Sequence, residues 1–330
     1  MTTTRRALLK AALVSPLACP ATATLAQGNW PQRAVRLIVP FAAGGPSDVL
    51  ARAFGKQLAD VIGQPVVIDN RSGAGGAIGI DMAAKAAPDG YTLGFGHTGT
   101  TAINPHVLQR MPYDPLTDLA PITPIVSYAN VLVVNANVPA NTVGGFVQWA
   151  KANPSAATFA SGGNGATNHL AGELLKALTG APLVHIPYRG SGPAMTDVIA
   201  GNVPCMFDIP VTVVPQLASG RIRALAILSS RRSSVLPDVP TLREAGFPGF
   251  EEAGSDLWFG LVGPAQLPAA LVERIHGQTV KVMRSREMLE TVKTMGYEPW
   301  TMVPAEFQAF IRADHAKWGK VVKASGLKRG

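Results

Sequence analysis

The stretch from Val35 to Ile62 constrains most strongly what this chain can fold into. It opens with a mostly apolar run that predicts a buried strand, and Pro40 ends that run. A turn of small residues follows, and residues 46–48 are typical of the first turn of a helix. Apolar residues then recur at helical spacing until Gly63, which predicts the helix end. A strand that leads through glycines to a helix N-terminus can bind an anion, although an ordinary strand–helix connection fits this stretch equally well.

The composition indicates a globular protein with room for two domains of ordinary size. The chain has 330 residues, of which 47% are hydrophobic and 15% charged, with a formal charge of +8. Its first 27 residues hold Arg5, Arg6 and Lys10 and no acid, so their removal lowers Lys+Arg from 29 to 26 against 21 acids. The remaining basic residues form no stripe interleaved with aromatics, so nothing in the sequence indicates a nucleic-acid-binding protein.

Residues 1–26 predict an export signal. Thr4–Lys10 resembles the twin-arginine pattern, and an apolar segment and small residues follow it. We expect cleavage after Ala26, with Ala23 as the alternative, and delivery to the periplasm by the twin-arginine or the general secretory route. No later run reaches 18 apolar residues, so no membrane-spanning helix is predicted.

The two cysteines say little about chemistry. Cys19 lies in the export signal and raises the alternative of a lipid anchor, which Pro16 disfavours. After cleavage Cys205 is the only cysteine, so no internal disulfide is expected. Because Cys205 lies in an apolar, strand-like run, we interpret it as a small core residue rather than a nucleophile.

Strands and helices alternate along the whole chain, which favours a doubly wound α/β architecture. A second strand–glycine–helix unit repeats the first in kind. Its strand is predicted at 158–160, its glycine loop at Ser161–Thr167 and its helix at Asn168–Leu178, with Gly180 as the end. Two such units predict two glycine loops, each at a helix N-terminus.

Two strand-rich segments, near 122–134 and 223–229, are good places for the chain to cross between lobes and return. They predict one discontinuous lobe of residues 27–124 with 229–330, and one continuous lobe of residues 125–228.

Six motifs, in order along the mature chain, carry a resemblance to a known family. They are Pro40–Asp48, Asn70–Gly76, Ala87–Leu93, Ser161–Gly165, His185–Gly190 and Leu236–Thr241. With them the chain resembles the Bug family, the type II periplasmic substrate-binding proteins of tripartite tricarboxylate transporters. The resemblance implies a two-lobed periplasmic-binding-protein fold, in which each lobe is a doubly wound sheet flanked by helices and two hinge crossings join the lobes.

The resemblance also implies a function and a site. It implies a monomeric, non-enzymatic protein without cofactor or metal that captures a di- or tricarboxylate, an acidic amino acid or an aromatic acid. Backbone N–H groups and ordered waters would hold the carboxylate, and the membrane subunits of the transporter would receive it. The implied ligand-binding residues are Phe41, Ala42, Ala43, Gly44, Gly45, Ser47, Asp48, Thr98, Ser161, Gly162, Gly163, Gly165, Ala166, Thr167 and Asp208.

The residues themselves support capture by the backbone. Neither glycine loop contains Arg or Lys, which argues against a guanidinium clamp. Asp48 would repel a carboxylate placed against it, so we favour a role in capping and loop support over one in reading a polar group of the ligand. Asp208 is equally consistent with a ligand contact and with a turn acid before Pro210.

Two other classes of function stay open on the sequence. A secreted α/β hydrolase or transferase would use Ser47 or Ser161 with a histidine, but no G-x-S-x-G motif occurs. A binding protein that signals through a partner without transport would have the same sequence features. The six histidines lack metal-binding spacing. His97 ends a strand beside Thr98, where we favour a hydrogen bond within its loop over a ligand contact.

Overall fold

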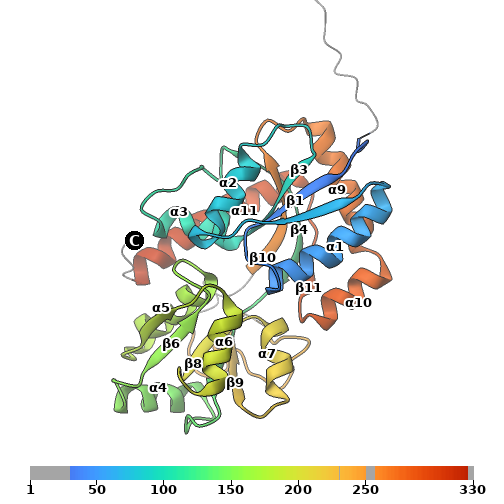
Figure 1. Ribbon diagram of the computed structural model, residues 1–330. Coiled ribbons are helices and arrows are strands. Elements are labelled where there is room, and N and C mark those ends of the chain that lie inside the picture. The colour runs from blue at the N-terminus through green and yellow to red at the C-terminus, as the bar shows by residue number, and fades with distance from the viewer. Residues whose placement is uncertain (1–29, 230, 250–256, 326–330) are drawn as a thin grey trace, which may run out of the picture. The chain divides into compact units, whose positions relative to one another are not determined.

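The computed structural model describes residues 30–229, 231–249 and 257–325. The predicted export signal at 1–26 lies outside these residues. Pro31–Gly330 forms one compact unit, which contains every strand described below. These strands form two sheets, each with its own helices (Figure 1).

The first sheet has six strands in the order β11-β4-β10-β3-β1-β2. The strands are β1 (Val35–Val39), β2 (Val66–Asn70), β3 (Thr92–His97), β4 (Leu119–Tyr128), β10 (Leu257–Pro264) and β11 (Glu298–Pro299). β1 runs parallel to β2 and β3, whereas β10 runs antiparallel between β3 and β4. The helices that accompany this sheet are α1 (Pro46–Ile62), α2 (Ala77–Ala84), α3 (Asn104–Val107), α9 (Ala269–Met283), α10 (Arg286–Thr294) and α11 (Pro304–Ser325).

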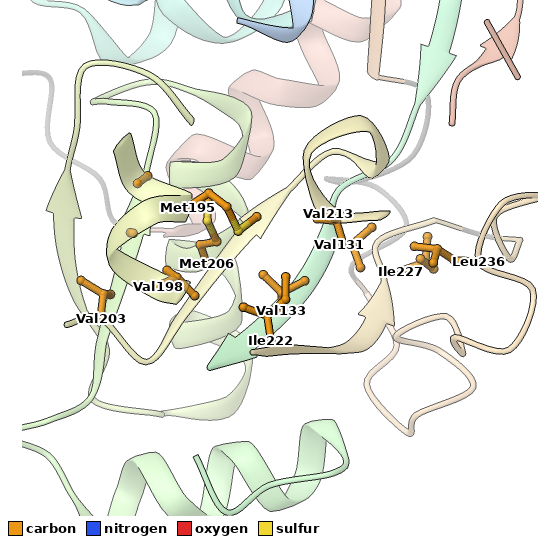
Figure 2. Close-up of a cluster of buried hydrophobic side chains, with 12 residues drawn as sticks. Val131, Val133, Met195, Val198, Val203, Met206, Val213, Ile222, Ile227 and Leu236 are labelled. Carbon is orange, nitrogen blue, oxygen red and sulfur yellow. The ribbon is translucent and has the colours of Figure 1, made fainter. Parts of the chain in front are cut away.

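The second sheet has five strands in the order β7-β6-β8-β5-β9. They are β5 (Val131–Asn135), β6 (Thr158–Ser161), β7 (Val184–Pro187), β8 (Cys205–Asp208) and β9 (Ile222–Ile227), with helices α4 (Val143–Ala152), α5 (Thr167–Thr179), α6 (Ser191–Ala200) and α7 (Pro210–Leu217). Figure 2 shows the core on one side of this sheet, where Val131 and Val133 of β5 lie among side chains of α6, β8 and α7. Cys205 is buried and free, as expected of a core residue.

The first strand–glycine–helix unit has the predicted structure. α1 begins at Pro46 and ends at Ile62, and the following residue, Gly63, takes the left-handed conformation with φ 70°. Leu50, Phe54 and Leu58, spaced four residues apart, are almost completely buried and fix the inner face of the helix.

Two elements after α1 have features of note. α2, which follows the Asn70–Gly76 motif, ends at Ala84, and helices usually end at or before the residue that precedes a proline, here Pro88. β3 extends to His97, and beyond it lies a single turn of π-helix at Gly99–Ile103. Such turns are rare and often lie at functional sites.

The chain passes between the sheets twice, once from β4 to β5 and once after β9. The two passages lie side by side, because the N–H of Leu228 donates to the carbonyl of Asn130 over 2.8 Å. The predicted two-lobed α/β fold is therefore confirmed, while the residue limits of the lobes stay a prediction. Within the described part of the chain, no helix combines the length and the apolar character that a bilayer span requires.

Candidate ligand-binding site

The first glycine loop, Phe41–Asp48, connects β1 to α1 and has an open tip. Residues 42–44 are exposed, and a Cβ built on Gly44 would meet no other atom within 4 Å. Gly44 has φ +80°, a conformation that glycine adopts without strain. No side chain caps the N-terminus of α1, so the first backbone N–H groups of the helix donate to no side chain of the cap residue Gly45.

Asp48 supports this loop from below. Its carboxylate accepts hydrogen bonds from the Gly44 N–H at 2.9 Å, from Arg52 Nε at 2.9 Å and from Asn70 Nδ2 at 2.9 Å. The same Asn70 amide donates to the carbonyl of Phe41. Burial alone would raise the pKa of Asp48, but these three donors together lower it, so the carboxylate is charged. Asp48 thus makes the contacts of a loop support, which was the favoured interpretation of the sequence.

The second glycine loop, Ser161–Thr167, connects β6 to α5 and uses its glycine donors internally. The N–H of Gly162 donates to Asn168 Oδ1, that of Gly163 to Ser161 Oγ and that of Gly165 to His169 Nδ1, over 3.1–3.2 Å. Sequence reasoning expected these donors to face the ligand, and in this conformation all three have partners within the loop and α5. The loop is therefore braced by neutral side chains, and no side chain caps the N-terminus of α5 that follows it.

A pair of stacked imidazoles lies under this second loop. The rings of His169 and His185 are 3.9 Å apart, and the ring of Phe159 stacks beneath both. His185 Nε2 lies 2.6 Å from Ser161 Oγ. Burial lowers the pKa of His169 to about 3 and that of His185 to about 4, so both rings are neutral at physiological pH. Sequence analysis did not place His185 at the site. His185 lies in β7 and Ser161 in β6, and only the pairing of these two strands brings the side chains together.

The contact between Ser161 and His185 is the kind that the hydrolase alternative predicts. A serine hydrolase also needs a group that orients the imidazole. Among the described residues no carboxylate hydrogen-bonds to the other ring nitrogen of His185, and Ser161 is completely buried. The arrangement holds the loop in place and lacks the parts of a catalytic triad.

Asp208 lies below the second loop, at the end of β8, and is 1% exposed. Its carboxylate accepts from the hydroxyls of Ser191 at 3.0 Å and Thr212 at 2.6 Å. Asn168 Nδ2 donates to Ser191 Oγ, so a chain of hydrogen bonds runs from the loop through Asn168 and Ser191 to Asp208. Burial raises the pKa of Asp208 to about 6, against the opposing effect of its donors. The sequence interpretation of Asp208 as a turn acid fits this position, and Asn168 and Ser191 were not anticipated.

Thr98 is completely buried beside the first loop, and its hydroxyl accepts from the N–H of Trp258 in β10. Its neighbour His97 contacts the ring of Phe41 at a centroid distance of 4.9 Å. From His97 an aromatic row continues through Phe259 to Tyr128, with centroid distances of 6.0 and 5.0 Å. This row links the first loop to the passage between the sheets.

The second loop lies against α3. A Cβ built on Gly165 of the second loop would lie 3.0 Å from Val107 Cγ2 and 3.2 Å from Asn104 Oδ1, which belong to the first sheet's helices. The side chain of Tyr128, at the end of β4, lies near that of Thr167. The second loop therefore lies close to α3 and to the end of β4. No group of three His, Cys, Asp or Glu within the described ranges could hold a metal ion.

Comparisons with known proteins agree on one family. The model of the family described as tripartite tricarboxylate transporter family receptor matches residues 50–327. Protein BugT of Bordetella pertussis is 35% identical over 307 residues, which cover 93% of each chain.

Solved structures give the same result. The R. palustris protein Rpa4515 with adipate is 35% identical, with a TM-score of 0.86 over 91% of this chain and 100% of the other. MatC from Rhodopseudomonas palustris with bound malate is 30% identical, with a TM-score of 0.81 over 89% of this chain and 100% of the other. The periplasmic binding protein BugD is 32% identical, with a TM-score of 0.82 over 91% and 100%.

Proposed function

The chain belongs to the tripartite tricarboxylate transporter receptor family, also known through its Bug members, and on this premise we propose that it captures an aliphatic dicarboxylate between its two glycine loops. As a member it is a periplasmic solute-binding protein and not an enzyme. We further propose that it is a monomer, that its export signal is cleaved after Ala26, and that it delivers the acid to transporter subunits in the membrane.

The observation that carries the ligand class is the pair of helix N-termini beneath the loops. α1 and α5 both begin without a side-chain cap, and neither loop supplies a cation. A helix N-terminus favours an anion by about 0.3–1 kcal/mol when exposed and by up to ~2 kcal/mol when partly buried. Each charge-assisted hydrogen bond adds about 1.5–3 kcal/mol, so a few of them reach the ~8 kcal/mol of micromolar affinity.

The choice of an aliphatic dicarboxylate rests on two similar proteins. Their names record adipate for one and malate for the other, at 35% and 30% identity to this chain. Both acids have a carboxylate at each end of a short aliphatic chain, and two anionic ends suit two helix N-termini. Contact with both loops would also make the closed arrangement of the lobes the one that binds more tightly.

A thermal-shift and calorimetric screen with adipate, malate, citrate, aspartate and benzoate tests the proposal. A ligand at 100 times its Kd stabilises the protein by about 2.7 kcal/mol, which gives a clear rise in Tm. We expect the largest rise with adipate or malate and no product after prolonged incubation. Binding of benzoate alone would contradict the ligand class, and turnover of any acid would contradict a pure binding protein.

A matched pair of glycine variants tests the place of binding. Gly44 and Gly63 have φ +80° and +70°, and a Cβ on either would meet nothing within 4 Å. Gly44→Ala and Gly63→Ala therefore have a similar strain, about 1 kcal/mol. Only Gly44 lies in the proposed site, so we expect Gly44→Ala alone to weaken binding, by about tenfold. Equal affinities of the two variants would place the ligand elsewhere.

Delivery is tested separately from binding. Labelled acid is offered to proteoliposomes that contain the membrane subunits, with and without the purified protein. We expect uptake only when the protein is present. A protein that binds the acid but never supports uptake would instead act as a ligand sensor.

A further inference from the structure

His97 has an unusual hydrogen-bonding pattern at the end of β3. Its backbone N–H donates to Thr100 Oγ1, and its carbonyl accepts from the hydroxyls of Thr100 and Thr101. In the ring, Nδ1 accepts from the N–H of Gly99 at 2.9 Å. Burial lowers the pKa of His97 to about 3, so the imidazole is neutral and its single proton lies on Nε2. The turn thus fixes both the position and the tautomer of the ring.

The Nε2–H group that results is a donor without an acceptor. His97 is 4% exposed, and Nε2 is buried with no hydrogen-bond partner among the described residues. A buried donor without a partner destabilises a fold, and such groups are rare in native proteins. An apolar side chain at this position would avoid the cost, which indicates that the donor has another use.

The Nε2–H donor of His97 lies close to Gly76 and to the first glycine loop. A Cβ built on Gly76 would lie 3.2 Å from His97 Nε2 and 3.0 Å from Thr100 Cγ2, so only a residue without a side chain lets the backbone pack this close to the donor. The ring of Phe41, at the start of the first loop, is 4.9 Å away. Parallel strands β1 and β3 end at the same edge of the sheet, which is where α/β proteins bind ligands.

The other end of the same turn faces the second loop. Asn104 Oδ1 is also buried without a partner, and it is the atom that a Cβ on Gly165 would approach to 3.2 Å. Residues 97–104 therefore run from the first loop at His97 to the second loop at Asn104. A group placed between the loops would lie against this segment.

From this geometry we propose that the Nε2–H of His97 donates a hydrogen bond to an oxygen atom of the bound acid and that it selects against acids with an ammonium group at that position. The inference rests on the proposed function and narrows its ligand class to acids whose substituent there is an oxygen. A neutral, single-tautomer donor can pair with a carboxylate, keto or hydroxyl oxygen, whereas an ammonium group has only donors to offer.

Two variants separate the two ring nitrogens. In His97→Asn the side-chain oxygen takes the place of Nδ1 and can still accept from Gly99, but nothing reaches the position of Nε2. In His97→Gln the amide nitrogen reaches the position of Nε2, but the acceptor for Gly99 is lost. We expect His97→Asn to keep its Tm without ligand and to lose about 10- to 100-fold in affinity for adipate or malate. His97→Gln should show the reverse, a lower Tm and the better affinity of the two.

Selectivity is measured with two matched pairs of acids, malate with aspartate and 2-hydroxyadipate with 2-aminoadipate. We expect the wild type to favour the oxygen acid of each pair and His97→Asn to reduce that preference at least tenfold. His276→Asn, in α9, is the control and should leave both affinity and preference unchanged. In NMR spectra of ¹⁵N-histidine protein, the Nε2–H signal of His97 should be present without ligand and should move downfield when the acid binds.

Three results would overturn the inference: unchanged affinity in His97→Asn, equal binding of the acids within each pair by the wild type, or an Nε2–H signal that saturating ligand does not move. Each can occur while the wild type binds a dicarboxylate normally, so the proposed function would survive. If the wild type binds none of the four acids, the ligand class itself is refuted.

Discussion

Each of the two glycine loops connects a strand to a helix N-terminus, but the side chains that hold them in place differ in charge. The first is supported by one charged carboxylate, Asp48, with donors on three sides. The second is braced by neutral groups, among them the amide of Asn168 and the imidazole of His169. The tip of the first loop is exposed, whereas Gly165 in the second is buried. A charged support responds to pH and substitution differently from a neutral one, so the two loops can be perturbed separately.

The largest expected effect concerns Asp208, the acid under the second loop. Its pKa is raised to about 6 from an ordinary 3.8, so the folded protein binds this proton more tightly than the unfolded chain does. The associated stability is complete below pH 3.8 and is lost as the pH rises through 6. The loss is on the order of 3 kcal/mol. Relative to wild type, Asp208→Asn should therefore gain that amount between pH 4 and 7.

Urea unfolding of both proteins across this range measures the difference. The comparison with the variant is needed because His169 and His185, whose pKa values are lowered, make the wild type more stable as the pH rises over the same interval. Parallel curves for wild type and Asp208→Asn would show that Asp208 does not titrate in this window.

Asp48→Asn should give a smaller effect of opposite sign. Its pKa is lowered in the folded state, so its contribution is present at neutral pH and is lost as the pH falls below 3.8. The amide keeps one acceptor for three donors, and we expect a loss of about 2 kcal/mol at pH 7. Arg52→Gln is the control and should cost less, because the guanidinium is half-exposed. Equal losses in the two variants would mean that the ion pair, and not the loop support, matters.

The smallest effect is expected from Gly165→Ala, compared with Gly180→Ala at the end of the same helix. Both glycines have positive φ, +77° and +64°, so both substitutions strain the backbone by about 1 kcal/mol. Only the Cβ at 165 would approach Val107 and Asn104. We expect it to hold the second loop away from the first sheet and to weaken dicarboxylate binding severalfold in calorimetry. Equal affinity of the two variants would show that ligand binding does not require the second loop to approach Val107 and Asn104.

Sequence reasoning predicted those features that depend on neighbouring residues. The strand–glycine–helix units were predicted because apolar spacing and residues such as Pro46 and Gly63 act within one element. The support role of Asp48 was favoured from electrostatics alone. The supporting partners were not found, because Asn70 lies in another strand.

The second loop was harder to predict for the same reason. The contact of Ser161 with His185, and the chain through Ser191 to Asp208, depend on how β6 pairs with β7 and β8. The π-helical turn after His97 was not predicted, because a single turn is too short to show a repeating pattern of apolar residues in the sequence.

The position of β10 has a consequence for the folding of the chain. All eight of its residues are buried, and it fills the place between β3 and β4. Until Leu257–Pro264 arrives, both strands keep an open edge, while the second sheet needs only residues 131–227 and can form from its own contacts. Pairings between distant segments form slowly and leave strand edges exposed to aggregation. The sheet of residues 131–227 can therefore form before the sheet that carries the first loop and His97, which needs a strand from the last quarter of the sequence.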